Sequence, residues 1–395
     1  ESIDIMETIK HPVIPYIEGD GIGPEVMTAA RAVLDAATAR AFGGAKIIKW
    51  MEIAAGEKAQ QIYGDALPGE TLQTIRQYKV AIKGPTATPV GGGRRSINVA
   101  LRRALDLFAC IRPVRYFPGV AAPVKHPERL NVVIFRENTE DVYAGIEWQQ
   151  GSDEALRVLR FLNENFKSGI KEDAGIGVKP ITRSASKRLI RKAIQYALDN
   201  RRRSVALVHK GNIMKYTEGA FCQWGYEVAR EEFPESVIAE KEARALGGAP
   251  SNKIIIKDVI ADNMFQQLIL RPEDCDVIAT TNLNGDYLSD ACAAQVGGLG
   301  LAPGANIGDD AAVFEATHGT APDIAGKGKA NPCSLILSGA MMLEHIGWRA
   351  AAERIHRAVS ETLAQRQATP DLADQMEGAT PLSTTDFAAA VIKNL

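Results

Sequence analysis

Short apolar runs alternate along this chain with segments of helical periodicity, and this alternation limits the possible folds more than any other feature. Runs rich in Val, Ile and Ala predict strands at residues 13–17, 131–135, 204–208, 253–256, 276–280 and 312–316. Strands interleaved with helices are typical of α/β proteins. A chain of 395 residues with 46% hydrophobic content can bury a sizeable core, and its length favours two or three compact lobes.

Three helices can be placed from the pattern. One begins near Glu25, after the first strand. Residues 333–346 are apolar almost all round, so that helix is expected to be buried. The segment after Trp348 has Ile355, Val359 and Leu363 on one face, which predicts an amphipathic helix.

The charge distribution argues against nucleic-acid and membrane partners. Net charge is −2 with 24% charged residues, so the chain has no overall positive potential. The one dense basic cluster, residues 201–203, lacks interleaved aromatic residues, which favours a solvated turn over a nucleic-acid patch. No apolar run approaches the roughly 18 residues that a membrane span requires.

The cysteines and the first residues bear on the compartment. Five scattered cysteines without a CxxC pair indicate neither a disulfide framework nor a zinc ribbon, so a reducing cytoplasm is expected. Residues 1–10 are polar and lack an apolar segment, which argues against a secretory signal, and the absence of an initial Met suggests a trimmed or partly ordered start.

Two glycine-rich segments leave alternatives open. Gly19, Gly21 and Gly23 follow a strand, but the third glycine of a G-x-G-x-x-G fingerprint would fall on Pro24, so a Rossmann site is not predicted. The segment is either a tight strand-to-helix turn or a turn beside a cofactor. Residues 297–306 form either a loop or a wall beside a flat ligand.

Paired carboxylates suggest a metal site. Asp286 and Asp290 are four residues apart, which places both side chains on one face of a helix. Oxygen ligands favour Mg²⁺ or Mn²⁺, and Asp262 is a third candidate. The alternative is a helix cap plus a solvated acid.

Three arginines and the start of a helix suggest a binding site for an anion. Ser96 can cap a helix on which Asn98 and Arg102 lie one turn apart, while Arg112 and Arg136 stand near the ends of elements. Several guanidinium groups suit a substrate with several carboxylates. Surface salt bridges are the alternative for any one arginine.

Tyr143 and Lys210 are candidates for acid–base chemistry. Lys210 follows the buried strand 204–208, and a lysine near a metal can lose its proton more readily, whereas a tyrosine can deliver one. Packing and an ordinary strand-end charge are the alternatives.

Six motifs together resemble the bacterial isocitrate dehydrogenases, members of the isocitrate/isopropylmalate family of β-decarboxylating dehydrogenases. They are Ser96-x-Asn98-x-x-x-Arg102, the arginine pair around Pro113, residues 136–141, residues 209–212, the segment from Asn284 to Asp290, and residues 315–322. The match extends almost from end to end. This resemblance implies oxidative decarboxylation of isocitrate to 2-oxoglutarate and CO₂, as in the tricarboxylic acid cycle.

The resemblance also implies a role for each matching position. The substrate carboxylates would be held by Ser96, Asn98, Arg102, Arg112 and Arg136. The metal ligands would be Asp262, Asp286 and Asp290, with Asp262 and Lys210 contributed by the other subunit. Lys210 and Asp262 would help remove the hydroxyl proton, and Tyr143 would protonate the enolate.

Polar residues on the helix that begins at Ser96 favour isocitrate as the substrate. Isopropylmalate dehydrogenases present apolar side chains there, whereas Ser96 and Asn98 suit a third carboxylate. A 3-isopropylmalate or homoisocitrate dehydrogenase is the alternative within the family. A non-catalytic binding protein on the same fold is the alternative outside enzymes.

The same resemblance leads us to expect NAD as the cofactor. NADP-using bacterial enzymes typically have Lys-Tyr where this chain has Asp323-Ile324, and an aspartate would accept hydrogen bonds from a free ribose diol but repel a phosphate. The cofactor-binding residues would be Thr88, His318, Gly319, Ala321, Asp323, Ile324 and Asn331.

The implied architecture is the non-Rossmann isocitrate/isopropylmalate dehydrogenase-like fold. A large α/β domain would comprise residues 1–107 and 297–395, and a small α/β domain residues 108–140 and 185–296. Residues 141–184 would form a clasp, and two subunits would make a homodimer with shared active sites.

Overall fold

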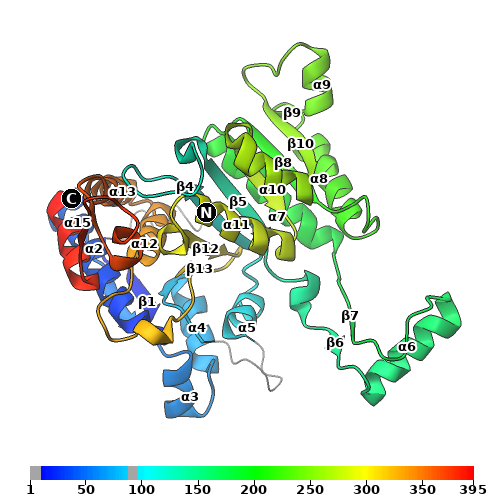
Figure 1. Ribbon diagram of the computed structural model, residues 1–395, viewed down its shortest axis with the longest axis horizontal. Helices are drawn as coiled ribbons and strands as arrows, with labels where there is room; N and C mark the ends of the chain where they lie inside the picture. Colours follow the sequence, from blue (N-terminus) through cyan, green and yellow to red (C-terminus); the bar gives the residue numbers. More distant parts are fainter. Residues whose placement is uncertain (1–9, 88–95) are drawn as a thin grey trace.

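An eleven-stranded sheet runs through the whole molecule (Figure 1). The computed structural model describes residues 10–87 and 96–395. The strand order is β2-β1-β3-β13-β12-β4-β5-β11-β8-β10-β9. The bounds are β1 Val13–Ile17, β2 Lys49–Glu52, β3 Val80–Lys83, β4 Ala109–Arg115, β5 Asn131–Glu137, β8 Ser204–His209, β9 Val237–Ala239, β10 Ile254–Ile260, β11 Val277–Thr280, β12 Pro303–Ile307 and β13 Ala312–Ala316.

The sheet is parallel at both ends and antiparallel in the middle. β12 pairs antiparallel with β13 and with β4, and β4 pairs antiparallel with β5. All other neighbours in the sheet are parallel. Each of the six predicted strands is confirmed to within a few residues, and so is the α/β fold class. The glycine-rich segment 297–306 is in part a strand, because its second half forms β12.

One end of the sheet is covered by helices of both chain ends. The apolar residues of α2, α12, α13 and α15 form one core with β1, β3, β12 and β13, and α4 and α5 contribute to a second core on the opposite face. α12 is buried almost all round, and Ile355, Val359 and Leu363 of α13 are fully buried, so both predicted C-terminal helices are confirmed. The bounds are α2 Gly23–Phe42, α3 Glu57–Tyr63, α4 Gly69–Tyr78, α5 Ile97–Ala104, α12 Cys333–His345, α13 Arg349–Ala364 and α15 Thr384–Asn394.

The other end of the sheet is sandwiched between two further helix pairs. Strand β8 is buried along its whole length, and its residues alternate between the two faces. Val205 and Leu207 pack with α7 and α8, whereas Ala206 and Val208 pack with α10 and α11. Successive apolar side chains of the strand therefore point to opposite faces, and each face of this parallel part of the sheet is covered by helices. The bounds are α7 Arg183–Asp199, α8 Glu218–Glu232, α9 Glu240–Ala245, α10 Ala261–Leu270 and α11 Asn282–Gln295.

Residues between β5 and α7 leave the main body as an arm (Figure 1). The arm contains a two-stranded antiparallel ribbon and α6, whose N-cap Ser152 accepts a hydrogen bond from Ala155 N. The division into two domains and a clasp remains a prediction. Bounds of the arm and of the short elements are β6 Glu147–Trp148, α6 Asp153–Phe166, β7 Ile176–Gly177, β14 Gln367–Ala368, α14 Pro370–Ala373, β15 Thr380–Pro381, η1 Pro127–Arg129, η2 Asp141–Ala144, η3 Pro272–Asp274, η4 Leu299–Leu301 and η5 Pro322–Ile324.

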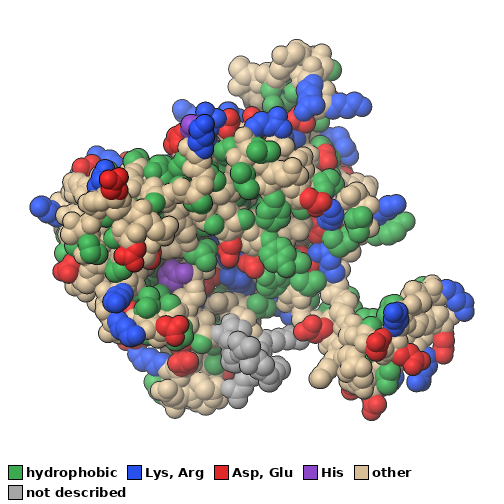
Figure 2. All heavy atoms as spheres, viewed as in Figure 1, with side chains coloured by type: hydrophobic (Ala, Val, Ile, Leu, Met, Phe, Trp, Pro, Cys, Tyr) green, Lys and Arg blue, Asp and Glu red, His purple; other side chains and the backbone are tan. Residues whose placement is uncertain are grey.

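The basic cluster at residues 201–203 is partly neutralised by one aspartate. Arg202 donates to Asp276 Oδ1 at 2.8 Å, and Arg203 N donates to Asp276 Oδ2. Basic and acidic side chains are interspersed over the face shown in Figure 2. Within residues 10–87 and 96–395, no helix is long and apolar enough to cross a membrane.

Substitution of Leu207 by Ala is expected to destabilise the chain by about 2–5 kcal/mol, because Leu207 is fully buried and its loss leaves a cavity in the core. The shift of the urea unfolding midpoint measures this. Leu246→Ala is the matched control, since Leu246 is 70% exposed and its truncation should change stability by no more than about 0.5 kcal/mol. Equal effects of the two substitutions would contradict the assigned core.

Candidate active site

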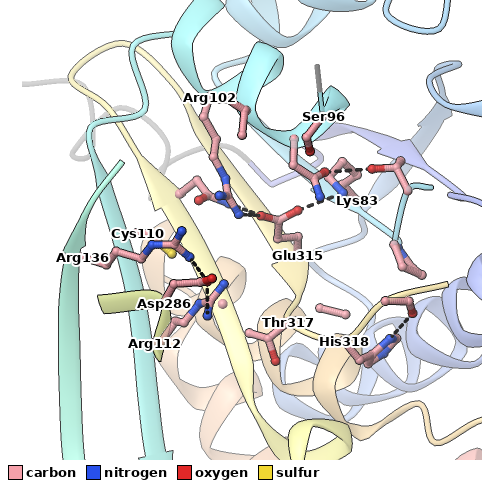
Figure 3. A pocket seen from close by; sticks show the side chains of 18 of the residues that line it. Lys83, Ser96, Arg102, Cys110, Arg112, Arg136, Asp286, Glu315, Thr317 and His318 are labelled. Carbon is pink, nitrogen blue, oxygen red and sulfur yellow. Dashed lines mark hydrogen bonds and ion pairs between the residues drawn. The ribbon is translucent and has the colours of Figure 1, made fainter. Parts of the chain in front are cut away.

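A cavity of ≈ 380 Å³ lies where the two parallel parts of the sheet meet at the antiparallel strands (Figure 3). One wall comes from β3, α5, β13 and the segment after β13, and the other from β4, β5, η2 and α11. Nine of the predicted site residues line it: Ser96, Asn98, Arg102, Arg112, Arg136, Tyr143, Asp286, His318 and Gly319.

Helix α5 places three of the expected substrate ligands on one wall. Ser96 is its N-cap residue, as predicted. Asn98 accepts a hydrogen bond from Thr86 Oγ1 at 2.8 Å, which connects the helix to the segment after β3. Arg102 lies one turn further and is buried. The helix start therefore faces the cavity together with a guanidinium group, an arrangement that favours a carboxylate.

The buried carboxylate of Glu315 holds Arg102 in place. Glu315 Oε1 accepts from Arg102 Nη2 at 2.7 Å, and Glu315 Oε2 lies 2.8 Å from Lys83 Nζ. Burial alone would raise the pKa of Glu315, but the charges of Lys83 and Arg102 hold it well below its usual range. The carboxylate is therefore ionised, and it orients Arg102 toward the cavity (Figure 3).

The opposite wall holds two arginines against the first of the paired aspartates. Arg136 Nη1 donates to Asp286 Oδ1, and its Nε donates to the backbone oxygen of Asn282. Arg112 Nη1 donates to Asp290 Oδ1 at 3.2 Å and lies 3.6 Å from Asp286 Oδ1. Asp286 and Asp290 both lie on α11, one turn apart, as predicted. Three guanidinium groups thus face one cavity.

Tyr143 donates its hydroxyl hydrogen to Asp286 Oδ2 at 2.7 Å, and Arg136 lies over its ring. Burial is the main reason that the pKa of Tyr143 rises to about 12, with Asp286 adding to the effect against Arg136. The phenol consequently holds its proton at neutral pH, and it can act as a proton donor inside the cavity.

The two aspartates of α11 fit a hard divalent cation. Both offer carboxylate oxygens, the ligands that Mg²⁺ and Mn²⁺ prefer. Burial raises the pKa of Asp290 despite the opposing charge of Arg112, so the arginines present do not fully compensate that carboxylate. Nearby cations lower the pKa of Asp286 against its burial. A cation at Asp290 would supply the missing compensation.

Lys210 and Asp262 lie apart from this cavity. Lys210 Nζ contacts both carboxylate oxygens of Asp262, at 2.6 and 2.5 Å, and the Asp262 side chain is 65% exposed. Within the described part of the chain, the one group of three side chains spaced for a metal is His209, Cys222 and Asp258. The single chain therefore does not bring Asp262 to Asp286 and Asp290.

His318 and Gly319 form the edge of the cavity expected to receive the cofactor. His318 Nδ1 lies 2.9 Å from Gly319 O, and its buried Nε2 has no hydrogen-bond partner among the described residues. A Cβ at Gly319 would meet no atom within 4 Å, so the backbone there is open to a ligand. An orphaned ring nitrogen beside open backbone fits a polar cofactor group.

The other cofactor candidates that the structure describes are not among the residues that line the cavity. Ala321 has a left-handed backbone (φ 39°) and precedes η5, which contains Asp323 and Ile324. Asn331 is buried, where it donates to Asp371 and accepts from Cys333 N at the start of α12. Thr88 lies outside the described residues.

The glycine turn after β1 supports the cavity wall. A Cβ at Gly19 would lie 2.2 Å from Pro85 O, and one at Gly21 would lie 2.1 Å from Thr320 O. The carboxylate of Asp20 accepts from Ala87 N at 2.7 Å. Glycine is required here because the turn packs directly against two segments that line the site.

Sequence reasoning missed several polar residues that line the cavity, chiefly Lys83, Glu315 and Asn306. The available signal was a single acid inside the apolar run 312–316 and a lysine at the end of Val80–Lys83. Charges within buried strands need partners, and these two residues are each other's partner.

Comparisons with known proteins agree with this geometry. A family model described as "Isocitrate/isopropylmalate dehydrogenase" matches residues 13–391. The chain is 56% identical over 387 residues to an "Isocitrate dehydrogenase [NADP]" of Archaeoglobus fulgidus, covering 98% of this chain and 93% of the relative. A protein of the same name from Staphylococcus epidermidis is 53% identical, with 100% and 98% covered. A crystal structure of isocitrate dehydrogenase from Methylococcus capsulatus superimposes with a TM-score of 0.81 at 42% identity, covering 97% and 99%.

The prediction of NAD as the cofactor is wrong. Relatives that are 53–56% identical are named for NADP. The prediction took the Asp323-Ile324 pair to select against a ribose phosphate without regard to the groups that lie around it in space. In the structure Asp323 is exposed, and its backbone oxygen accepts a hydrogen bond from Lys327 Nζ at 2.7 Å. An ammonium group therefore stands against the same turn, and the sign of one side chain does not decide the charge that a ribose phosphate would meet.

Glu140→Gln is expected to stabilise the chain more at pH 8 than at pH 5. Burial raises the pKa of Glu140 to about 7, so its protonated form favours the folded state below the ordinary carboxyl pKa. That stability is lost as the pH rises through about 7. The difference between the two pH values should be about 1–2 kcal/mol after solvent screening.

Thermal unfolding of wild type and variant at both pH values measures this difference. Glu128→Gln is the control, because Glu128 is exposed on η1. A pH-independent effect of Glu140→Gln would contradict the assignment of Glu140 as the titrating group.

Proposed function

Because the chain belongs to the isocitrate/isopropylmalate dehydrogenase family, we propose that it catalyses the NADP-dependent oxidative decarboxylation of isocitrate to 2-oxoglutarate and CO₂. The main support is the convergence on one cavity of Arg102, which lies on α5, with Arg112 and Arg136 from the opposite wall. Three guanidinium groups match the three carboxylates of isocitrate in number and charge.

The arginines retain donors for the substrate. Nε of Arg102 and Nε of Arg112 are buried and have no hydrogen-bond partner among the described residues. A buried N–H donor without a hydrogen-bond partner costs free energy. A carboxylate bound in the cavity would accept hydrogen bonds from these donors and would compensate the positive charge of the guanidinium groups. Asn98 adds a polar side chain on the same wall. The polar wall favours isocitrate over a substrate with an isopropyl group.

Two groups of this chain would move protons during the reaction. Tyr143 keeps its proton at neutral pH and would deliver it to the carbon that loses CO₂. Lys210, held by Asp262, would help to take the proton of the substrate hydroxyl. Because Lys210 and Asp262 lie apart from the cavity of their own chain, we propose that this pair serves the cavity of a second copy, whereas Tyr143 serves its own.

A homodimer would also cover apolar surface. Large exposed hydrophobic side chains lie on α10, on α11 and on the segment after β8 that follows Lys210: Ile269, Leu270, Tyr287, Ile213 and Tyr216. Hydrophobic side chains gather over α10 and α11 in Figure 2. This surface adjoins Asp262 at the start of α10, so a partner bound there would meet the Lys210–Asp262 pair.

The cation would be held by Asp286 and Asp290 together with Asp262 of a second copy, and NADP by the edge at His318 and Gly319. When bound, Mg²⁺ or Mn²⁺ would stabilise negative charge on the substrate oxygens, while NADP would accept two electrons from the substrate. The arginines would orient the substrate in the cavity that Tyr143 also lines.

The purified chain is expected to reduce NADP in the presence of isocitrate and Mg²⁺ or Mn²⁺, and EDTA should abolish the reaction. Absorbance at the wavelength of reduced nicotinamide measures the rate. Parallel assays with 3-isopropylmalate and homoisocitrate test the alternative substrates. A higher kcat/KM for either one, or no reduction with any of the three, would refute the proposal.

Tyr143→Phe is expected to lower kcat about 100- to 1,000-fold with little change in the KM for isocitrate, because a proton donor is lost while the ring stays over Arg136. Steady-state kinetics measure both parameters. Tyr63→Phe is the control, since Tyr63 is 58% exposed on α3. An unchanged kcat would exclude Tyr143 as the donor.

A further inference from the structure

Lys179 lies where the arm returns to the main body, between β7 and α7. Its ammonium group contacts two carboxylates, Asp141 Oδ1 at 2.5 Å and Glu218 Oε1 at 3.0 Å. Both carboxylate side chains are completely buried, and the Lys179 side chain is only 18% exposed. These three residues form the Lys179 cluster, in which one cation holds together groups from three distant parts of the chain.

Asp141 connects the turn of Tyr143 to helix α11. Its backbone is left-handed (φ 70°), a conformation that a residue with a Cβ rarely adopts. The carboxylate accepts from Val142 N at 2.7 Å and from Leu283 N at 3.0 Å. The strained turn that presents Tyr143 is therefore held to the first turn of the helix that carries Asp286.

Glu218 connects the same helix to the segment of Lys210. Its Oε2 accepts from Lys210 N at 2.9 Å and from Asn284 Nδ2 at 2.8 Å. Its Oε1 accepts from Thr281 Oγ1, on the N-cap residue of α11, at 2.8 Å. Glu218 thus fixes the lysine segment relative to the start of α11.

We propose that Lys179 is a positioning residue, which keeps the Tyr143 turn, the aspartate helix α11 and the Lys210 segment in one fixed arrangement; this rests on the proposed function. Without its ammonium group, two buried carboxylates would face the same helix start with only backbone and side-chain dipoles to compensate them. Their repulsion would separate the turn of Asp141 from the segment held by Glu218. The three elements that present the reacting groups would then move independently.

Lys179→Met tests the proposal, with Lys171→Met as the matched control because Lys171 is exposed on the same arm. Lys179→Met should lower kcat by about 100-fold and change the KM for isocitrate less than twofold, since geometry around the reacting atoms is lost while the arginines remain. Lys179→Arg should recover most of the rate, because a guanidinium group can bridge both carboxylates. An unchanged kcat in Lys179→Met, or no recovery with Arg, would overturn the proposal.

Hydrogen exchange gives a second measure that does not depend on activity. The amides of Leu283 and Lys210 donate to Asp141 and Glu218, so both should exchange faster in Lys179→Met and be unchanged in Lys171→Met. Faster exchange confined to the arm and the Asp141 turn, with Lys210 unaffected, would overturn the proposal.

The exchange result also separates the two proposals. If the wild type does not act on isocitrate but both amides respond, the coupling stands and the proposed function fails. If Lys179→Met does not fold, the same exchange measurement is made on Lys179→Gln, which retains a hydrogen-bond donor without the charge.

Discussion

The buried ion pairs of Glu315 with Lys83 and Arg102 are the interaction on which the site depends. Glu315 lies on β13, Lys83 on the neighbouring β3, and Arg102 on α5, so one carboxylate fixes a guanidinium of the cavity to the middle of the sheet. Breaking a buried pair leaves an uncompensated charge, typically at a cost of about 3–5 kcal/mol. The ion pair therefore fixes the position of Arg102 relative to β3 and β13.

The same carboxylate begins a polar connection across the antiparallel strands. Glu315 Oε1 accepts from Asn306 Nδ2 on β12, and Asn306 Oδ1 accepts from Asn138 Nδ2, which follows β5. Asn138 Nδ2 also donates to Leu107 O. The two walls of the cavity are therefore joined by hydrogen bonds through the centre of the sheet. A substrate gripped by arginines from both walls would meet a preorganised frame.

Local patterns predicted six of the eleven strands of the sheet and the helices that begin near Glu25, Ser96, Cys333 and Trp348, because periodicity is a property of contiguous sequence. Motif spacing, with the resemblance that it supports, predicted nine of the residues that line the cavity. The apolar run 204–208 and the spacing of Asp286 and Asp290 each correspond to one element. The partnership of Lys83 with Glu315 could not be predicted in this way, since it depends on β13 inserting beside β3, 232 positions away along the chain (315 − 83). The cofactor prediction failed for a related reason: Asp323 was considered without Lys327, whose ammonium group the chain folds back onto the same turn.

The position of Lys210 outside the cavity lining of its own chain indicates how two copies would cooperate in the proposed homodimer. Lys210 directly follows β8, which lies near one edge of the sheet, and it is not among the residues that line the cavity. In the proposed homodimer, a second molecule would bring its Lys210–Asp262 pair to the cavity that holds Tyr143. In such an assembly Glu218 and Asp141 would connect a group that serves one cavity with a turn that serves the other. The ammonium group of Lys179, which lies between these two carboxylates of one chain, would then set where the two active sites lie relative to each other.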